Sequence, residues 1–381
     1  MLRSGPKGKQ NNVRMKKRIK VLHIINELEM GGAQRLVTDM VTRMSKMEDM
    51  EIGLLTLGDK KDEHLHSLIL SDPAIRFHEL KAKRPFSPIF LRQLNAVGKG
   101  YDIIHAHLFP SGYVAALSNF RNKKPVIFTE HSTHNRRRDI RLLRPLERMI
   151  YSRYSTIAAI SPQAAEKLDS WLKSNKLSPK IRTINNGVNL SRFSSSPEVS
   201  SKDIFGREGR AIIMISRFTG AKDHETLIKS VPLLEDKEMF LALVGDGPTL
   251  EACKELAHHY GVSDRCLFLG TRTDIPALIH ASWIGVQSSH WEGFGLTAIE
   301  IMACGKPIIA SDVPGLGNIV EGAGLLFPKG NAEALARNIN ILANSPEEYK
   351  ALVKMGKARA YEYDIANTVE KYVKLYKESL E

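Results

Sequence analysis

The sequence predicts an α/β protein of two domains, each an open and mostly parallel sheet covered by helices. Strand-like apolar runs alternate with helix-like segments along most of the chain, and this alternation is typical of parallel sheets with crossover helices. The length of 381 residues exceeds the size at which one hydrophobic core keeps growing, so two domains are expected.

The first series of apolar runs predicts an N-terminal domain, assigned to residues 15–195. Its predicted strands are residues 20–25, 51–57, 102–108, 125–130, 155–161 and 181–188. Short helices fit between them. No motif guides the interpretation of residues 59–100, where we expect acceptor specificity to reside.

The second series predicts a C-terminal domain, assigned to residues 196–360, with a final helix over 361–381. Its predicted strands are residues 211–216, 239–245, 266–270, 283–289, 306–312 and 323–327. Residues 191–210 are rich in Ser, Gly and charge and are interpreted as the connection between the domains. Two such sheets joined by one linker leave a cleft between their carboxyl ends, where ligands of open α/β sheets bind.

The net charge of +13 comes from two segments, because the rest of the chain is balanced. Residues 1–20 hold eight Lys and Arg and no acid, while residues 136–153 hold seven Arg against two acids. Residues 1–14 lack apolar periodicity, and we interpret them as a disordered or added extension rather than a nucleic-acid arm. Basic residues without interleaved aromatic residues do not favour nucleic-acid binding.

The arginine-rich segment is different, because apolar residues alternate with its arginines at helical spacing. It is either a solvated face over a core or a surface for anionic lipid or an acidic acceptor. Since the segment follows a histidine-bearing strand end, Arg136, Arg137 and Arg138 are weak candidates for acceptor binding, together with His107 at a neighbouring strand end.

No apolar run is long enough to span a bilayer, and the N-terminus does not resemble a secretory signal. Cys253, Cys266 and Cys304 have no metal-type spacing and are interpreted as reduced thiols. We therefore expect a cytoplasmic protein, with a peripheral position on the cytoplasmic membrane as an option.

Residues 289–312, SHWEGFGLTAIEIMACGKPIIASD, hold the most informative motif. Gly293 and Gly295 form a sharp turn that opens a helix, and helix N-termini bind phosphate through unpaired N–H groups. Glu300 lies one turn into the helix, within reach of a ribose. Glu292 precedes the turn, where it suits a sugar hydroxyl or the positive charge that builds as a glycosidic bond breaks.

The same stretch also matches a degenerate dinucleotide-binding pattern, formed by Gly293, Gly295 and Ala298 with Asp312 at a strand end. That pattern is kept as a rival hypothesis. A third interpretation is a purely structural surface turn carrying two glutamates.

Arg217 and Lys222 stand on a loop that leaves the first strand of the second domain, just before a helix. Such loop cations are usually solvated. Beside a helix N-terminus, however, they would stabilise a diphosphate leaving group without a metal. No Asp-x-Asp stands at a strand end to hold a divalent ion, so we expect no metal and no cofactor.

The first domain supplies weaker signals. Gly31 and Gly32 follow its first strand and would let the backbone approach a ligand. His107 and His131 stand at two strand ends, where a histidine is either packed in the core, hydrogen-bonded to a sugar hydroxyl or a base.

Taken together, these motifs resemble glycosyltransferase family 4, the retaining nucleotide-sugar-dependent enzymes of the GT-B fold, with two facing Rossmann-like domains. The resemblance covers most of the chain and lowers the weight of the dinucleotide rival. The segments that carry it are residues 31–35, 102–107, 129–132, 185–193, 216–224, 243–248, 268–279 and 289–315.

The resemblance implies a role for each matched residue. Arg217 and Lys222 would clamp the donor diphosphate, Glu300 would bind the ribose, and Glu292 would contact the transferred sugar. Gly32 would face the diphosphate, and His131 would lie beside the sugar. Backbone N–H groups near the phosphate and sugar would come from Phe294, Gly295 and Leu296. The base would be held through the backbone of Arg272 and Thr273. The resemblance also implies that the final helix crosses back to the first domain.

The expected activity is therefore retaining transfer of a hexose or N-acetylhexosamine from a nucleotide-sugar, with a UDP-sugar favoured on base rates, to a saccharide or lipid-linked saccharide. Two alternatives stay open, a nucleotide-sugar epimerase and a non-catalytic binding protein of the same fold.

Overall fold

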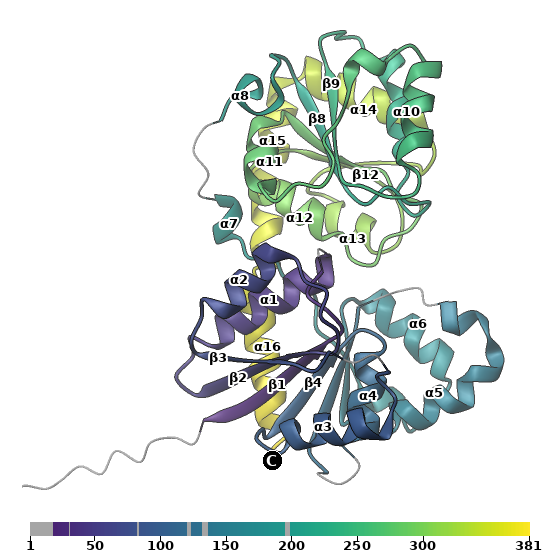
Figure 1. Ribbon diagram of the computed structural model, residues 1–381. Helices are drawn as coiled ribbons and strands as arrows, with labels where there is room; N and C mark the ends of the chain where they lie inside the picture. The colour runs from purple at the N-terminus through teal and green to yellow at the C-terminus, as the bar shows by residue number, and fades with distance from the viewer. Residues whose placement is uncertain (1–17, 30, 82–83, 120–122, 132–135, 195–198) are drawn as a thin grey trace, which may run out of the picture.

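The computed structural model describes residues 18–29, 31–81, 84–119, 123–131, 136–194 and 199–381, and it consists of two α/β domains (Figure 1). The extension expected over residues 1–14 lies outside these residues. Both sheets are wholly parallel in their pairings, which agrees with the fold class predicted from the alternation of apolar runs.

The N-terminal domain is built on a seven-stranded sheet in the order β3-β2-β1-β4-β5-β6-β7. Its strands are β1 (Ile19–Ile25), β2 (Met50–Thr56), β3 (Ile75–Glu79), β4 (Ile103–His107), β5 (Val126–Glu130), β6 (Thr156–Ala159) and β7 (Ile181–Thr183). The sequence patterns did not predict β3, an edge strand with partly exposed polar side chains.

Helices cover both faces of this sheet, and the strands supply alternate side chains to each face. Helices α1 (Gly32–Met44) and α2 (Glu63–Leu70) share one core with Val21 and Ile25 of β1. The opposite face packs against α3 (Pro88–Gly98), α4 (Ser111–Ser118), α5 (Arg144–Tyr151) and α6 (Pro162–Leu172).

The C-terminal domain has a six-stranded sheet in the order β10-β9-β8-β11-β12-β13. Its strands are β8 (Ala211–Ile215), β9 (Phe240–Val244), β10 (Cys266–Phe268), β11 (Ile284–Gln287), β12 (Ile308–Ser311) and β13 (Leu325–Phe327). Its helices are α9 (His224–Ser230), α10 (Leu250–His259), α11 (Ile275–Ala281), α12 (Leu296–Ala303), α13 (Leu316–Val320), α14 (Ala332–Asn344) and α15 (Pro346–Glu362). The connecting segment forms α7 (Ser191–Ser194) and α8 (Ser201–Phe205).

The chain passes between the domains twice, and the two crossings lie side by side. The N–H of Val188 donates to the Tyr363 carbonyl at 2.8 Å, and the N–H of Ile365 donates to the Val188 carbonyl at 2.9 Å. A Cβ on Gly187 would lie 2.7 Å from the Ile365 Cα, so only glycine fits where these segments meet.

After the second crossing the chain returns to the N-terminal domain. Helix α16 (Ile365–Glu378) buries Val369, Tyr372 and Tyr376 in the core that α1 and β1 share, and it runs along that sheet in Figure 1. The last helix is therefore an integral part of the N-terminal domain.

Candidate active site

In each sheet the order in which strands are added switches from one side to the other, between β1 and β4 in the first sheet and between β8 and β11 in the second. Crevices at such switch points are the usual ligand sites of open α/β sheets. A cavity of about 950 Å³ lies between the domains. The predicted site residues that line it are Gly31, Gly32, Arg217, Arg272, Thr273, Leu296 and Glu300.

The turn before α12 is formed as the glycine pattern predicts. Gly295 has φ 98°, a left-handed conformation that favours glycine, and it caps the N-terminus of the helix. The first N–H groups of a helix have no intrahelical acceptor, and the first two residues of this helix, Leu296 and Thr297, line the cavity. Phe294 is buried in the domain core, which leaves only its backbone for a ligand.

Lys222 and Glu292 form an ion pair between the loop after β8 and the turn before α12. The backbone holds the two loops together, because the N–H of Asp223 donates to the Ser288 carbonyl at 3.1 Å and the N–H of His290 donates to the Ala221 carbonyl at 2.9 Å. Glu292 also accepts the N–H of Gly293 at 3.1 Å. The two side chains that were assigned to the diphosphate and the sugar are thus each other's partners.

Arg217 differs from Lys222. Its side chain is exposed at the cavity wall, and within the described part of the chain it makes no ion pair. A guanidinium with free donors at the start of a helix is well suited to a phosphate.

Glu300 lies in α12 and lines the cavity, and burial raises its pKa to about 7 against the opposing charges of Arg192 and Arg35. Burial also raises the pKa of Asp39, although Arg35 Nε donates to its carboxylate at 3.1 Å. At neutral pH the site can therefore exchange a proton at Glu300.

Arg35, Asp39 and Arg192, which were not predicted as site residues, line the same cavity as Glu300 and act on it electrostatically. Arg35 and Arg192 stand inside matched segments, at residues 31–35 and 185–193, and that was the available signal. Asp39 gave no signal of its own.

Arg272 and Thr273 also line the cavity. The Arg272 guanidinium is bound to Asp274 through two contacts of 2.8 and 2.6 Å. Since the side chain is engaged, the backbone is what this edge offers to a ligand.

The two domains meet through their predicted site residues. A Cβ on Gly32 would lie 3.6 Å from Leu296 Cδ1, and a Cβ on Gly293 would lie 3.7 Å from the His131 carbonyl oxygen. His131 therefore adjoins the glycine turn, although neither it nor Lys222 nor Glu292 lines the main cavity.

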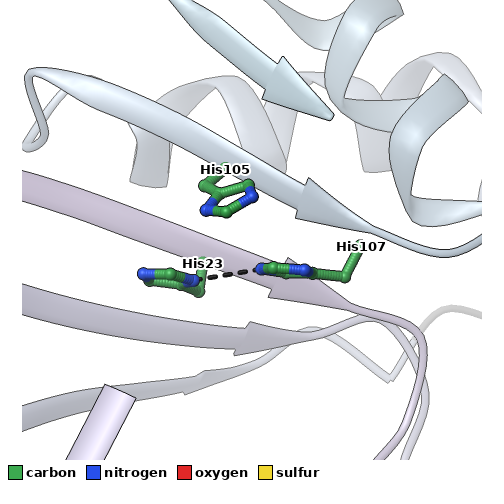
Figure 2. Close-up of side chains that lie close together, drawn as sticks. All are labelled: His23, His105 and His107. Atoms are coloured by element: carbon green, nitrogen blue, oxygen red, sulfur yellow. Dashed lines mark hydrogen bonds between the residues drawn. The ribbon is translucent and has the colours of Figure 1, made fainter. Parts of the chain in front are cut away.

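His107 is fully buried; it bonds to His23 (Figure 2) and, on its other side, to His131. The expectation that His107 contacts the acceptor is not met by this geometry, because its ring lies behind His131. His23 was not singled out from the sequence, although a histidine inside an apolar strand is a recognisable signal.

The arginines proposed for the acceptor are engaged with the domain itself. Arg137 Nε lies 3.1 Å from Glu147 Oε1, and its guanidinium stacks over the Phe109 ring at 3.9 Å. Arg138 pairs with Glu130, and its side chain is 9% exposed. Direct acceptor binding by Arg138 therefore conflicts with its burial; the Arg136 side chain lies outside the described residues.

The exposed part of this segment is apolar instead. Ile140, Leu142, Leu146 and Met149 all project into solvent, with Leu142 90% exposed. Arg148 donates to the carbonyl of Leu172, so the basic residues partly fix the segment while the apolar ones face outward. In the described part of the chain no helix combines the length and apolar character that a bilayer span requires.

Comparison with known proteins identifies the family. The model of glycosyltransferase family 4 matches residues 30–192, and that of glycosyl transferases group 1 matches residues 197–359. An uncharacterized glycosyltransferase of Methanocaldococcus jannaschii is 28% identical over 368 residues, covering 91% of this chain and 95% of that protein.

Two further relatives are informative. The N,N'-diacetylbacillosaminyl-diphospho-undecaprenol alpha-1,3-N-acetylgalactosaminyltransferase of Campylobacter jejuni is 30% identical over 213 residues, covering 54% of this chain and 55% of that protein. HepE of Anabaena, solved in complex with UDP and glucose, has a TM-score of 0.82 at 19% identity and covers 95% of this chain and 100% of its own. With these matches and this two-domain architecture, the chain belongs to glycosyltransferase family 4 and has the GT-B fold.

Proposed function

We propose that this glycosyltransferase moves a hexose or N-acetylhexosamine from a nucleotide diphosphate sugar, a UDP-sugar in the first place, to a saccharide or lipid-linked saccharide. The observation that carries the proposal is the cavity between the domains, where Arg217, the start of α12 and Glu300 face Gly31 and Gly32. One cavity thus holds a cation, the start of a helix and a carboxylate, which are the groups that bind a diphosphate and a ribose.

The proposed step retains the configuration of the anomeric carbon. The bond from that carbon to the donor phosphate oxygen breaks, and the acceptor hydroxyl oxygen bonds to the carbon on the same face. The departing phosphate oxygen takes the proton of that hydroxyl. This step needs no carboxylate nucleophile, because the acceptor oxygen bonds to the carbon directly and the departing phosphate oxygen serves as the base.

The protein then has to stabilise departing negative charge. Arg217 and the N–H groups after Gly295 are available for this in the structure. Lys222 becomes available once a diphosphate competes with Glu292 for its ammonium group, and Glu292 is then free for a sugar hydroxyl. Preorganised donors of this kind each contribute about 2.7–4 kcal/mol to transition-state stabilisation.

Two observations support a UDP-sugar and a lipid-linked acceptor. The structure of HepE was solved with UDP and glucose, and the Campylobacter jejuni relative is named for an acceptor on diphospho-undecaprenol. The exposed apolar surface of residues 140–149 would let the enzyme rest on the membrane that holds such an acceptor.

A panel of nucleotide diphosphates and nucleotide-sugars tests the donor by thermal shift, since a ligand of the native state raises the unfolding temperature. Transfer with the best donor is then followed by NMR of the product's anomeric proton. Stabilisation with retained configuration supports the proposal. Donor conversion without acceptor would identify an epimerase, and stabilisation without any turnover would identify a binding protein.

A further inference from the structure

Three histidines meet at the switch point of the N-terminal sheet (Figure 2). His23 on β1 is paired in register with His105 on β4, and His107 follows two residues later on the same face of that strand. All three side chains have no solvent exposure. Strand alternation alone therefore places three imidazoles together inside the domain.

Two hydrogen bonds link His23, His107 and His131 in a row. His23 Nδ1 lies 3.1 Å from His107 Nε2, and His107 Nδ1 lies 3.2 Å from His131 Nε2. Burial lowers the pKa of His23 to about 3 and that of His131 to about 4. At neutral pH the chain consists of neutral rings, each with one N–H donor and one acceptor nitrogen.

Each bond joins Nδ1 of one neutral ring to Nε2 of the next. The three rings must therefore all carry their proton on Nδ1 or all carry it on Nε2. Since His107 uses both of its nitrogens, one of its two bonds is donated and the other is accepted. The outer nitrogens, His23 Nε2 and His131 Nδ1, are buried and have no partner among the described residues. One of them therefore carries a proton without an acceptor, and the other carries a lone pair without a donor.

The surroundings of His23 Nε2 and His131 Nδ1 indicate which of these two nitrogens carries the unpaired proton. A buried N–H without a partner is rarer than an acceptor without one. His23 has no solvent exposure, whereas His131 is half-buried and its carbonyl oxygen lies near Gly293 of the site. This difference favours the proton at the His131 end, so that His23, His107 and His131 are each protonated on Nδ1.

A metal site is the rival explanation, because the ligand nitrogens of His23, His105 and His107 lie within 4.8 Å of one another. His105, however, bonds through Nδ1 to the Tyr376 hydroxyl at 2.6 Å and through Nε2 to Thr129 Oγ1 at 2.7 Å. Both of its nitrogens are thus occupied, which leaves at most two rings for an ion.

We propose that His23 and His107 are positioning residues that hold His131 as its Nδ1–H tautomer. His131 then meets the donor sugar, or its phosphate, as a hydrogen-bond donor and not as a base. The proposal rests on the transferase function proposed above, and it gives one chemical meaning to His107 at the end of β4 and to the buried His23 of β1.

NMR tests the tautomer without any substrate. In protein labelled with ¹⁵N-histidine, long-range ¹H–¹⁵N correlations distinguish Nδ1–H from Nε2–H rings, and loss of signals in His131→Ala and His107→Gln assigns them. Nδ1–H rings at both positions support the proposal. An Nε2–H ring at His131, or one equivalent of bound transition metal by elemental analysis, would overturn it even if the protein is a fully active transferase.

Kinetics test the consequence. His23→Leu removes the donor that fixes His107, whereas His23→Asn keeps an amide N–H close to the position of Nδ1. We expect turnover to fall about ten- to a hundredfold in His23→Leu, the range seen when outer partners of functional histidines are removed, with donor KM little changed. His23→Asn should recover most of the loss, and His78→Leu, which removes a histidine of β3 bonded to Tyr101, should leave turnover unchanged. Equal loss in the Leu and Asn variants, or none in a folded His23→Leu, contradicts the proposal.

Discussion

Lys222 and Glu292, 70 residues apart in the chain, form an ion pair at the carboxyl end of the C-terminal sheet. Both are partly buried, with side chains 20% and 16% exposed. Each is therefore neutralised by the other until a ligand arrives. In the proposed mechanism, a diphosphate that pairs with Lys222 would release Glu292, and the freed carboxylate would then contact the sugar.

This relationship predicts different effects of two variants. Lys222→Ala should lower both UDP affinity and turnover. Glu292→Gln should lower turnover at least about a hundredfold, as loss of one preorganised transition-state contact does, while UDP binds as well as before or better because Lys222 is free. Calorimetry with UDP and initial rates of transfer measure the two quantities.

The matched control is Lys229→Ala, which removes a lysine paired with Glu225 on the exposed side of α9 and should change neither quantity. Lys229→Ala should leave the unfolding temperature near the wild-type value, since exposed pairs contribute about 0–1 kcal/mol. Lys222→Ala and Glu292→Gln should lower it more, because each removes one partner of a mostly buried pair. Near-normal transfer by folded Glu292→Gln would remove Glu292 from the mechanism.

Glu300 predicts a pH dependence of nucleotide binding. Burial raises its pKa to about 7, and ribose hydroxyls donate to the carboxylate form. UDP affinity should therefore fall as the pH is lowered through about 7, and the Glu300→Gln variant should lose this component and keep only the ionisation of the nucleotide. Calorimetry across that pH range provides the measurement, with the exposed Glu255→Gln of α10 as control.

The same shift affects stability. The folded protein binds the Glu300 proton more tightly than the unfolded chain, so the stabilising contribution of protonated Glu300 is lost as pH rises from about 4.5 to about 7. Glu300→Gln should consequently unfold at a higher temperature than wild type above pH 7, and the advantage should shrink in acid. An advantage that grows on acidification would contradict the assignment of the shift.

The close packing at Gly187 predicts that the interdomain crossing does not tolerate a larger side chain at this position. An added Cβ would lie 2.7 Å from the Ile365 Cα and 3.0 Å from its N, and backbone atoms cannot yield as a flexible side chain can. Gly187→Ala should therefore destabilise by about 1–3 kcal/mol and disturb domain closure, so that donor KM rises. Gly206→Ala tests a glycine with no neighbour within 4 Å and should cost less in KM, although its positive φ carries its own strain.

The surface of residues 140–149 predicts membrane attachment. Leu142→Asp and Leu146→Asp should weaken binding to vesicles of equimolar phosphatidylcholine and phosphatidylglycerol, because each removes exposed apolar area and adds a charge of the wrong sign. Sedimentation with vesicles measures this, and the exposed Leu233→Asp of the other domain is the control. Equal binding of all variants would leave the segment as an ordinary solvated face.

The proposed diphosphate clamp predicts activity without divalent ions. Arg217, Lys222 and the N–H groups after Gly295 supply the positive field that a metal would otherwise provide. Transfer should persist in EDTA, and Arg217→Ala should not be rescued by added Mg²⁺ or Mn²⁺. Loss of transfer in EDTA with recovery on adding metal would overturn this part of the mechanism.

Much of the architecture could be predicted from the sequence because its signals are local. Alternating apolar runs predicted twelve of the thirteen strands found among the described residues. The spacing of Gly293, Gly295 and Glu300 predicted a turn, a helix start and a carboxylate in one site. The edge strand β3 was not predicted, because its side chains are too polar and too exposed to form an apolar run.

Pairings between distant residues were decided only by the tertiary structure. The sequence alone indicated His107 and Arg138 as ligand contacts. In the structure, the strand order buries His107 between His23 and His131, and Arg138 forms an ion pair with Glu130. Periodicity indicates which face of a strand or helix a residue occupies. The partner on the opposing element depends on how the sheets order their strands and how the two domains meet.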